Sequence, residues 1–368
     1  MIVELMKKRN LKERNQKHME KKIKIGNRFV GEGERTYIVA EVSANHLQDY
    51  SRAEAIIRAA ADAGADAVKL QTYTSDTITI DCDNEYFQIT QGTIWDGTTL
   101  HKLYETAYTP WEWQPKLKKY AEELGMECFS SPFDATAVDF MHEMDMPAYK
   151  VASFEINDIP LIRKIARLGK PVIIATGIAY LEDIERALRV CREEGNEQVI
   201  LLKCTSTYPS PYEDMNLSVI PNMAQVFDCL TGLSDHSMGS AAAVAGVALG
   251  AKMVEKHLTL ARADGGPDAA FSMEPAEFKR MVEEIRIAEK AIGRVTYELT
   301  EKQKRSREDS RSLFAVKDIK AGEIFTEENV RSIRPAFGMH PMYYDEVLGQ
   351  QAKVDIAKGT PMDWKYIM

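Results

Sequence analysis

The stretch that decides the fold is Val226-Phe-Asp-Cys-Leu-Thr-Gly-Leu-Ser-Asp-His236, followed by an alanine-rich segment and then by Gly250-Ala-Lys-Met-Val-Glu-Lys-His257. Each half is a short apolar run that ends in a histidine, and the Gly239 to Leu249 segment between them favours a helix. Strand, helix and strand in this order predict neighbouring parallel strands. Both imidazoles then leave the sheet at the same edge, where two histidines can hold a divalent metal.

The same alternation extends over most of the chain. Apolar, β-branched runs predict strands at residues 37–42, 67–70, 126–130, 148–152, 172–175, 199–203, 229–233 and 253–256. Helical patterns follow at residues 51–63, 111–124, 135–144, 159–168, 181–194, 217–225, 239–249 and 275–292. Eight such repeats predict an α/β chain whose parallel sheet closes into a (β/α)₈ TIM barrel.

The remaining segments divide the chain into parts. A basic N-terminal extension, residues 1–22, precedes the barrel domain, residues 23–295, which carries a polar and aromatic insertion from Thr74 to Tyr108. Residues 296–309 are charged, and they read either as a linker or as a last helix. Residues 310–368 hold short strands and turns, which predict a small, mostly β domain.

Composition excludes several classes of protein. The net charge of −9 argues against a nucleic-acid-binding protein. The N-terminus lacks an apolar core of a signal peptide, and the small-residue stretch from Gly239 to Ala251 is too short to cross a membrane. Five scattered cysteines without a CxxC spacing suit a reducing compartment, so we expect a cytoplasmic protein without disulfides.

Polar side chains follow every predicted strand. In a barrel of this type the carboxyl ends of the strands line one shared site, so these side chains should meet. Burying so many of them without a ligand would be costly. In chain order they are Glu41, Lys69, Gln71, Ser130, Ser131, Lys150, Ser153, Thr176, Lys203, Thr205, Ser206, Ser234, Asp235, His236, Glu255 and His257.

These side chains fall into three chemical groups. Lys69 and Lys150, with the nearby hydroxyls, suit a phosphate or phosphoenol ester, because lysine supplies charge and hydroxyls supply directed hydrogen bonds. His236 and His257 suit a divalent cation with open positions. Carboxylates and amides suit the hydroxyl and amide groups of a sugar, and they are Glu41, Gln71 and Asp268.

Each assignment has a structural alternative. A strand-end lysine is often a salt-bridge partner, and a single histidine is often a hydrogen-bonded core residue. Asp235 fits a metal ligand, a helix cap or a supporting partner equally well. We expect the aromatic cluster Trp95, Tyr104, Trp111 and Trp113 to pack the insertion on the barrel rather than to bind a ligand.

Taken together, the motifs resemble the sialic acid synthase family, and the last 60 residues or so resemble the antifreeze-like (SAF) domain of that family. The resemblance runs from about Ile23 to the C-terminus. The motifs that carry it are Ala40-Glu-Val-Ser-Ala-Asn-His, Val68-Lys-Leu-Gln-Thr, Tyr149-Lys-Val-Ala-Ser, Lys203-Cys-Thr-Ser-Thr-Tyr-Pro, Gly232-Leu-Ser-Asp-His and Glu255-Lys-His.

The resemblance implies a reaction. Phosphoenolpyruvate would condense with an N-acylated amino-deoxyhexose, releasing phosphate, with catalysis by Glu41, Glu255 and His236. Glu255 would handle the proton of the attacking water. Phosphoenolpyruvate would be held by residues Lys69, Ser131, Lys150, Ser153, Thr176, Ser206 and Ser234. The sugar would face Glu41, Gln71, Tyr208 and Asp268.

The resemblance also implies a metal and a partner subunit. His236 and His257 would ligate Mn²⁺, with Mg²⁺ or Co²⁺ as alternatives. Arg334 of the end domain would reach into the barrel of a second copy, which makes the protein a domain-swapped homodimer.

Within the family, several segments are most like members that form pseudaminate from 2,4-diacetamido-2,4,6-trideoxy-L-altrose. They include Thr93-Ile-Trp-Asp-Gly, Phe129-Ser-Ser-Pro-Phe-Asp and Gly266-Pro-Asp-Ala-Ala-Phe. Members that form N-acetylneuraminate usually carry a His after Gly-Pro-Asp and an Asn in place of Ser206. N-acetylneuraminate and legionaminate synthases remain the near alternatives, and a metal-dependent barrel hydrolase or a carbohydrate-binding module are the distant ones.

Overall fold

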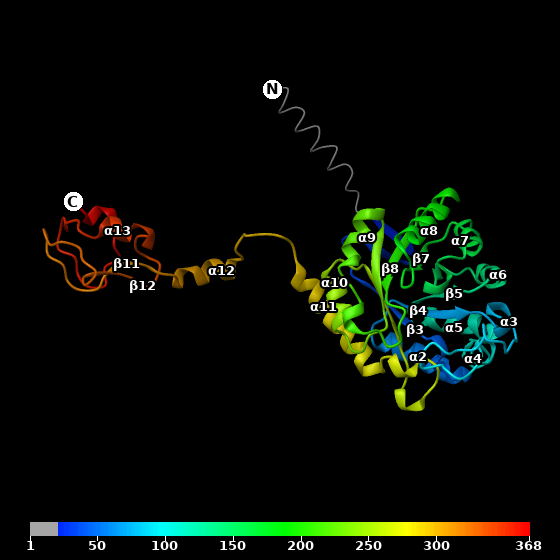
Figure 1. Cartoon of the computed structure of the whole chain (residues 1–368). Helices are drawn as coiled ribbons and strands as arrows, with labels where there is room; N and C mark the ends of the chain where they lie inside the picture. Colours follow the sequence, from blue (N-terminus) through cyan, green and yellow to red (C-terminus); the bar gives the residue numbers. More distant parts are fainter. Residues whose placement is uncertain (1–20) are drawn as a thin grey trace, which may run out of the picture. The chain divides into compact units, whose positions relative to one another are not determined.

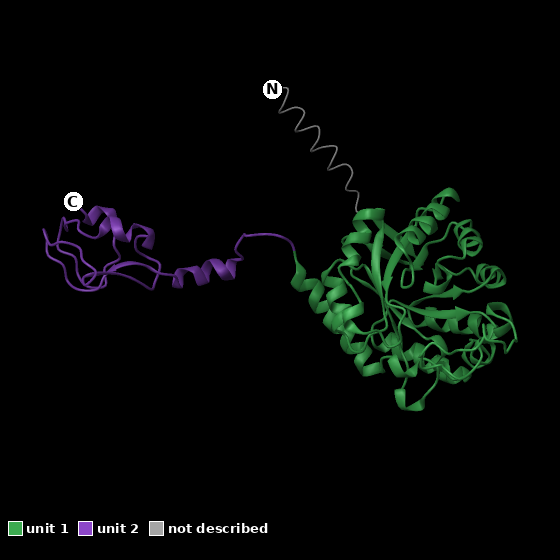
Figure 2. Cartoon of the chain, viewed as in Figure 1, with its two compact units in different colours: residues 1–293 green, residues 294–368 purple. Residues whose placement is uncertain are grey.

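The computed structural model describes residues 21–368. The chain divides into two compact units, the first ending at Gly293 and the second covering Arg294–Met368 (Figure 2). The predicted N-terminal extension falls on residues outside the described part, except for Lys21 and Lys22, and Lys22 already begins the first strand.

The first unit is built on a closed barrel of parallel strands (Figure 1). In chain order these are β3 (Tyr37–Glu41), β4 (Ala67–Thr72), β5 (Glu127–Pro132), β6 (Tyr149–Val151), β7 (Val172–Ala175), β8 (Val199–Cys204), β9 (Leu230–Asp235) and β10 (Met253–His257). The barrel closes where β10 pairs with β3, which sets His257 opposite Glu41. The predicted (β/α)₈ fold is confirmed.

Eight helices cover the barrel between and after the strands. They are α2 (Tyr50–Asp62), α5 (Gln114–Glu123), α6 (Ala135–Glu143), α7 (Ile159–Ala166), α8 (Leu181–Glu193), α9 (Val219–Phe227), α10 (Ala241–Ala248) and α11 (Pro275–Ile292). Helix α7 begins as predicted, because the Asp158 carboxylate accepts a hydrogen bond from Leu161 N and Pro160 fits the first turn. Its apolar side buries Leu161, Ile162 and Ile165.

Two boundary predictions are wrong for local reasons. Val226 belongs to α9 rather than to the strand before His236, because Asp228 adopts a left-handed conformation with φ of 47° that ends the helix. The helix predicted to start at Ser51 begins one residue earlier, at Tyr50. Asp49 is the cap, and its side chain accepts from the backbone of Ser51 and Arg52.

An antiparallel hairpin, which the sequence pattern did not predict, precedes the barrel. It consists of β1 (Lys22–Ile25) and β2 (Arg28–Gly31), joined by a turn in which Gly26 has a φ of +57°. Its apolar side chains, including Ile25 and Val30, join the cluster that fills the barrel interior. The hairpin therefore belongs to the same core as the strands.

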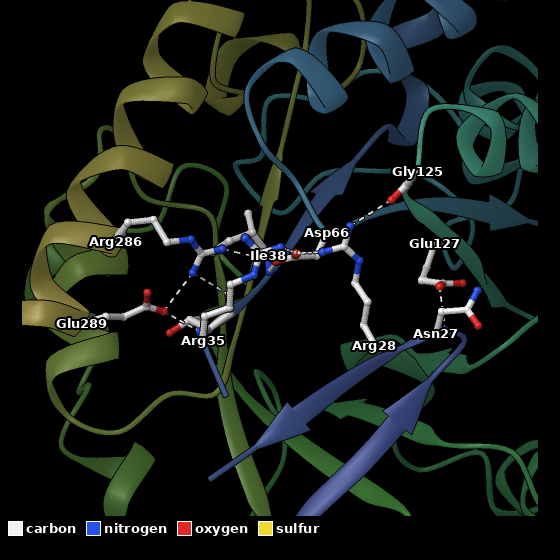
Figure 3. A network of polar contacts seen from close by, with 10 residues as sticks. Asn27, Arg28, Arg35, Ile38, Asp66, Gly125, Glu127, Arg286 and Glu289 are labelled. Carbon is white, nitrogen blue, oxygen red and sulfur yellow. Dashed lines mark hydrogen bonds and ion pairs between the residues drawn. The ribbon is translucent and has the colours of Figure 1, made fainter. Parts of the chain in front are cut away.

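A network around the buried Asp66 joins this hairpin to the barrel (Figure 3). The Asp66 carboxylate accepts from Arg28 Nη1 at 2.6 Å, from Arg286 Nη2 at 3.3 Å and from Ile38 N at 2.9 Å, and it also pairs with Arg35. These groups come from β2, from α11, from β3 itself and from the residue pair just before β3. One carboxylate at the amino end of β4 thus ties the first and last elements of the barrel together.

The insertion between β4 and α5 has structure of its own. It contains α3 (Ser75–Ile78) and α4 (Leu100–Ala107), with a short antiparallel contact between Gln88 and Thr99. It leaves the barrel at the carboxyl end of β4, which is the end where the polar side chains gather.

The second unit is small and has its own core. It contains α12 (Glu301–Ser306), β11 (Ser312–Ala315), β12 (Val330–Ile333) and α13 (Tyr344–Val347). The charged segment 296–309, which read as a linker or a helix, thus includes a short helix. Leu313, Phe325 and Val330 are buried at the centre of this unit. Across residues 21–368, no helix has both the length and the apolar character needed to cross a membrane.

Replacing Asp66 with Asn should destabilise the barrel by about 2–4 kcal/mol, because three arginines lose their shared carboxylate. The urea midpoint of the barrel's unfolding transition, followed by circular dichroism, measures this loss. The matched control is Asp139→Asn, since Asp139 pairs with Lys164 on the surface at 2.7 Å. The control should cost less than about 1 kcal/mol, and equal shifts for both variants would contradict a role for the network.

Candidate active site

A cavity of about 490 Å³ lies at the carboxyl ends of the strands. It is large enough for two small molecules, and its lining combines charged strand ends with apolar side chains of the insertion. Most of the site residues expected from the sequence line it. They are Lys69, Gln71, Lys150, Ser153, Tyr208, Ser234, His236, Glu255, His257 and Asp268.

A buried cluster of four charged side chains forms the centre of the site. Lys69 Nζ lies 2.6 Å from Glu41 Oε2 and 3.1 Å from Glu255 Oε1. Lys150 Nζ lies 3.9 Å from Glu255 Oε1. All four side chains are almost inaccessible to solvent. The lysines are therefore salt-bridge partners that also line the cavity, and their binding of a phosphate group stays a prediction.

The pKa values of the two carboxyl groups in this cluster shift in opposite directions. Burial raises the pKa of Glu41 to about 7, although Lys69 opposes the shift. Burial also disfavours the charge of Glu255, but Lys150 and Lys69 outweigh it and lower the pKa to about 2. Two carboxyl groups with separated pKa values are the arrangement from which acid and base roles are assigned.

The two lysines differ as well. Burial disfavours the charge of Lys69, yet Glu255 and Glu41 raise its pKa above the usual value. Burial prevails at Lys150, whose pKa is lowered. The two lysines offset the two carboxyl groups, so an anionic ligand can approach the lysines without a net negative charge to oppose it.

The histidines lie side by side as the sequence predicted, with ring centroids 5.2 Å apart. His236 Nδ1 lies 3.7 Å from Cys204 Sγ, and His257 Nδ1 is buried without a hydrogen-bond partner. Burial lowers the pKa of His257 well below its usual value, which keeps the ring neutral as metal binding requires. Two adjacent rings and an unpartnered buried nitrogen fit a divalent cation.

Asp235 does not face this position. Its carboxylate accepts from Lys256 Nζ at 2.6 Å and from Ser237 N at 2.8 Å. It therefore orients the turn after β9, which resolves the alternatives that the sequence left open. Within residues 21–368, no group of three or more His, Cys, Asp or Glu side chains is arranged to hold a metal. A bound ion would complete its coordination with substrate oxygens or water.

Several predicted hydroxyls lie behind the lining. Ser206 Oγ donates to Ser153 Oγ at 2.9 Å, and Ser131 Oγ lies 3.5 Å from Lys69 Nζ. Thr176 Oγ1 donates to the Leu202 carbonyl at 3.1 Å. Gly177 leaves room for the pair of Ser153 and Ser206, because a Cβ at this position would lie 2.1 Å from Ser206 Oγ. Among the predicted hydroxyls, Ser131 thus lies next to Lys69, and Ser234 Oγ donates to Glu255 Oε1 at 3.0 Å.

Gln71, Tyr208 and Asp268, which were expected to face a sugar, line the cavity, whereas Glu41 is fully buried and does not line it. The Asp268 carboxylate accepts from Ser43 Oγ and from Ala44 N at 3.3 Å, and burial raises its pKa. The Tyr208 ring packs 4.5 Å from the His236 ring and 5.6 Å from the Trp95 ring. Arg334 follows β12 in the second unit, and its expected role stays a prediction.

Two side chains of the insertion correct the expectation that its aromatic residues only pack. Trp111 stacks on Phe140 and Trp113 packs on Tyr50, as packing residues do. Trp95 and Tyr104, in contrast, line the cavity. Trp95 also donates to the Pro267 carbonyl at 2.9 Å, which joins the insertion to the loop after β10.

Glu155 is a site residue that the sequence reasoning missed. It ends the short 3₁₀ turn Ser153–Glu155 after β6 and lines the cavity. Its Oε2 is buried without a hydrogen-bond partner, and burial raises its pKa to about 7. Its position two residues beyond Ser153 was the one available signal.

Comparison with known proteins agrees with this geometry. The chain matches the NeuB family over residues 56–297 and the SAF domain over residues 310–368. It is 47% identical to a pseudaminic acid synthase of Campylobacter jejuni over 89% of this chain and 95% of the relative. It is 43% identical to a pseudaminic acid synthase of Helicobacter pylori over 88% of this chain and 96% of that one.

A solved structure agrees in fold. The spore coat polysaccharide biosynthesis protein SpsE of Bacillus subtilis superposes with a TM-score of 0.65 at 33% identity, over 95% of this chain and 99% of that one. The resemblance drawn from the motifs is confirmed, and the chain belongs to the NeuB family of sialic acid synthases, with a SAF domain at its C-terminus.

Proposed function

We propose that the protein is a pseudaminic acid synthase. It condenses phosphoenolpyruvate with 2,4-diacetamido-2,4,6-trideoxy-L-altrose and releases phosphate. The observation that carries this proposal is the meeting of two buried lysines and two adjacent histidines in one cavity. The names and the identity of the relatives support the choice of sugar.

The lysines and serines hold phosphoenolpyruvate in this proposal. Lys69 and Lys150 supply charge, while Ser153 and Ser234 line the same cavity with hydroxyl donors. Ser131, Thr176 and Ser206 support them from behind. When the anion binds, it competes with Glu255 for the lysines, so the carboxylate loses part of the attraction that keeps its pKa low.

His236 and His257 hold a divalent cation, for which we propose Mn²⁺, with Mg²⁺ or Co²⁺ as alternatives. When bound, such an ion polarises the aldehyde oxygen of the sugar as a Lewis acid. Gln71, Tyr208 and Asp268 orient the sugar beside it. A barrel hydrolase would usually need a third protein ligand, and residues 21–368 contain no such group.

Proton transfer falls to the carboxyl groups around Lys69. The enol carbon bonds to the aldehyde carbon, water adds to the resulting cationic carbon, and the C–O bond to phosphate breaks. Glu41, with a pKa of about 7, is suited to give a proton to the new hydroxyl group. Glu255 is the base that accepts the proton of the water, once bound anion has relieved its pairing with Lys69.

The end domain completes the proposal. Arg334 of a second copy reaches the sugar site, so the working form is a homodimer with exchanged end domains. We place this enzyme in the cytoplasm, which suits the five thiols, all of which are free.

A phosphate-release assay tests the function. Phosphate should appear only when phosphoenolpyruvate, the 2,4-diacetamido sugar and Mn²⁺ are all present. Omitting any one of them, or adding a chelator, should abolish the release. N-acetylmannosamine and the legionaminate precursor, offered side by side, should be used at least tenfold less well. A preference for either would reassign the sugar.

His257→Ala should lower kcat by at least 100-fold while the melting temperature stays within a few degrees, because the variant loses a metal ligand at the rim. His142→Ala is the matched control, since His142 is exposed at the end of α6. It should retain full activity. Wild-type turnover by His257→Ala would remove this residue from the metal site.

Glu155→Gln should change how stability depends on pH. The carboxyl group has a raised pKa in the folded state, so wild-type stability is full below about pH 4.5 and falls as the pH rises towards 7. The variant should be more stable than wild type at pH 8 by about 1–3 kcal/mol and equal to it near pH 5. Urea unfolding at both pH values measures this, and parallel curves would contradict the raised pKa.

A further inference from the structure

The insertion contributes an aliphatic surface to the cavity. Five of its side chains line the same space as the lysines and histidines, and we call them the apolar wall. They are Ile78, Ile89, Leu100, Leu103 and Ala107. The proposed chemistry uses none of them, because the groups that hold phosphoenolpyruvate and the metal all come from strand ends.

The wall is a built surface rather than a loose loop. Leu100, Leu103 and Ala107 recur on one face of α4 at the spacing of helical turns. Thr99 caps this helix through Lys102 N, and His101 Nε2 lies 2.9 Å from Asp76 Oδ1 of α3. The helix that carries the wall is therefore fixed at its start.

Aromatic side chains support the wall from the barrel side. Tyr104 of α4 meets Tyr73 edge to face at 5.6 Å, and Tyr73 meets Phe133 in the same way at 5.1 Å. All three rings also line the cavity. This packing holds the wall against β4 and β5, so a substrate meets a preformed surface.

An aliphatic surface distinguishes a methyl group from a hydroxymethyl group. Burying one methyl group there is favourable, whereas a hydroxyl that reaches the wall gives up its hydrogen bonds to water without replacement. The wall belongs to the insertion, which begins beyond the carboxyl end of β4. Lys69, in contrast, lies inside β4, so the wall is farther from the barrel interior than Lys69 is.

We propose that the apolar wall selects sugars that carry a methyl group at C6. The inference rests on the proposed function, in which the aldehyde carbon C1 reacts at the lysines and histidines. C6 is the other end of the six-carbon chain and is directed to the insertion. In 2,4-diacetamido-2,4,6-trideoxy-L-altrose this carbon is a methyl group, which the wall can bury without loss of hydrogen bonds.

The test compares this sugar with its 6-hydroxy counterpart, 2,4-diacetamido-2,4-dideoxy-L-altrose. Wild-type kcat/KM should favour the 6-deoxy sugar by roughly 10- to 100-fold. Leu103→Asn offers the hydroxyl a partner on a branched side chain with the same number of heavy atoms, so the ratio should fall to within about threefold of one. The KM for phosphoenolpyruvate should stay unchanged, because Lys69 and Lys150 belong to β4 and β6 rather than to the insertion.

Two variants serve as controls. Leu103→Met keeps the wall apolar and should keep the wild-type ratio. Leu181→Asn makes the same change at an exposed leucine of α8, and it should also leave the ratio unaltered.

The outcomes separate the wall from the proposed function. The proposal for the wall would be wrong if the wild-type enzyme used both sugars equally well, or if Leu103→Asn kept the same preference as the wild type. Either result would leave the synthase activity in place. No phosphate release with either sugar would instead overturn the function itself. If Leu103→Asn does not fold, Leu100→Asn takes its place. The wild-type enzyme alone also tests the proposal, because equal kcat/KM values for the two sugars would contradict it.

Discussion

The position of Lys69 between Glu41 and Glu255 is the constraint on which the rest of the site depends. The two carboxylates belong to the first and last strands of the barrel, and the lysine belongs to the second. They meet only because β10 pairs with β3 and closes the sheet. An open sheet would separate Glu255 from Lys69, and a buried charge that loses its partner is far more costly than a charge in water.

This arrangement also separates the properties of chemically similar groups. Glu41 and Glu255 share one lysine, yet Lys150 lies near Glu255 and favours its ionised form. Glu41 has no second cation as close, so burial dominates and its pKa rises. Register between strands, rather than residue type, thus produces one carboxyl group that can donate a proton and one that can accept it.

Much of this organisation could be predicted from the sequence, because strand periodicity and strand-end residues are local signals. The alternation predicted the barrel, and the polar strand ends predicted the lysines and histidines that line one cavity. The rest depends on contacts between segments far apart in the chain. Trp95 reaches Pro267 and Asp235 turns to Lys256, and neither contact has a local signature. The hairpin at Lys22–Gly31 was missed although its first strand alternates, because two antiparallel strands in direct succession fall outside the repeat of strand and helix that predicted the barrel.

The network around Asp66 occupies the amino ends of the strands, whereas the ligand groups occupy the carboxyl ends. The contacts that stabilise the barrel and the groups that bind ligands therefore lie at opposite ends of the strands. Mutations that reshape the 74–108 segment leave the arginine network in place, so an ancestral enzyme could acquire a new sugar preference without first becoming more stable. A change of sugar preference made in the insertion therefore leaves the contacts that stabilise the barrel untouched.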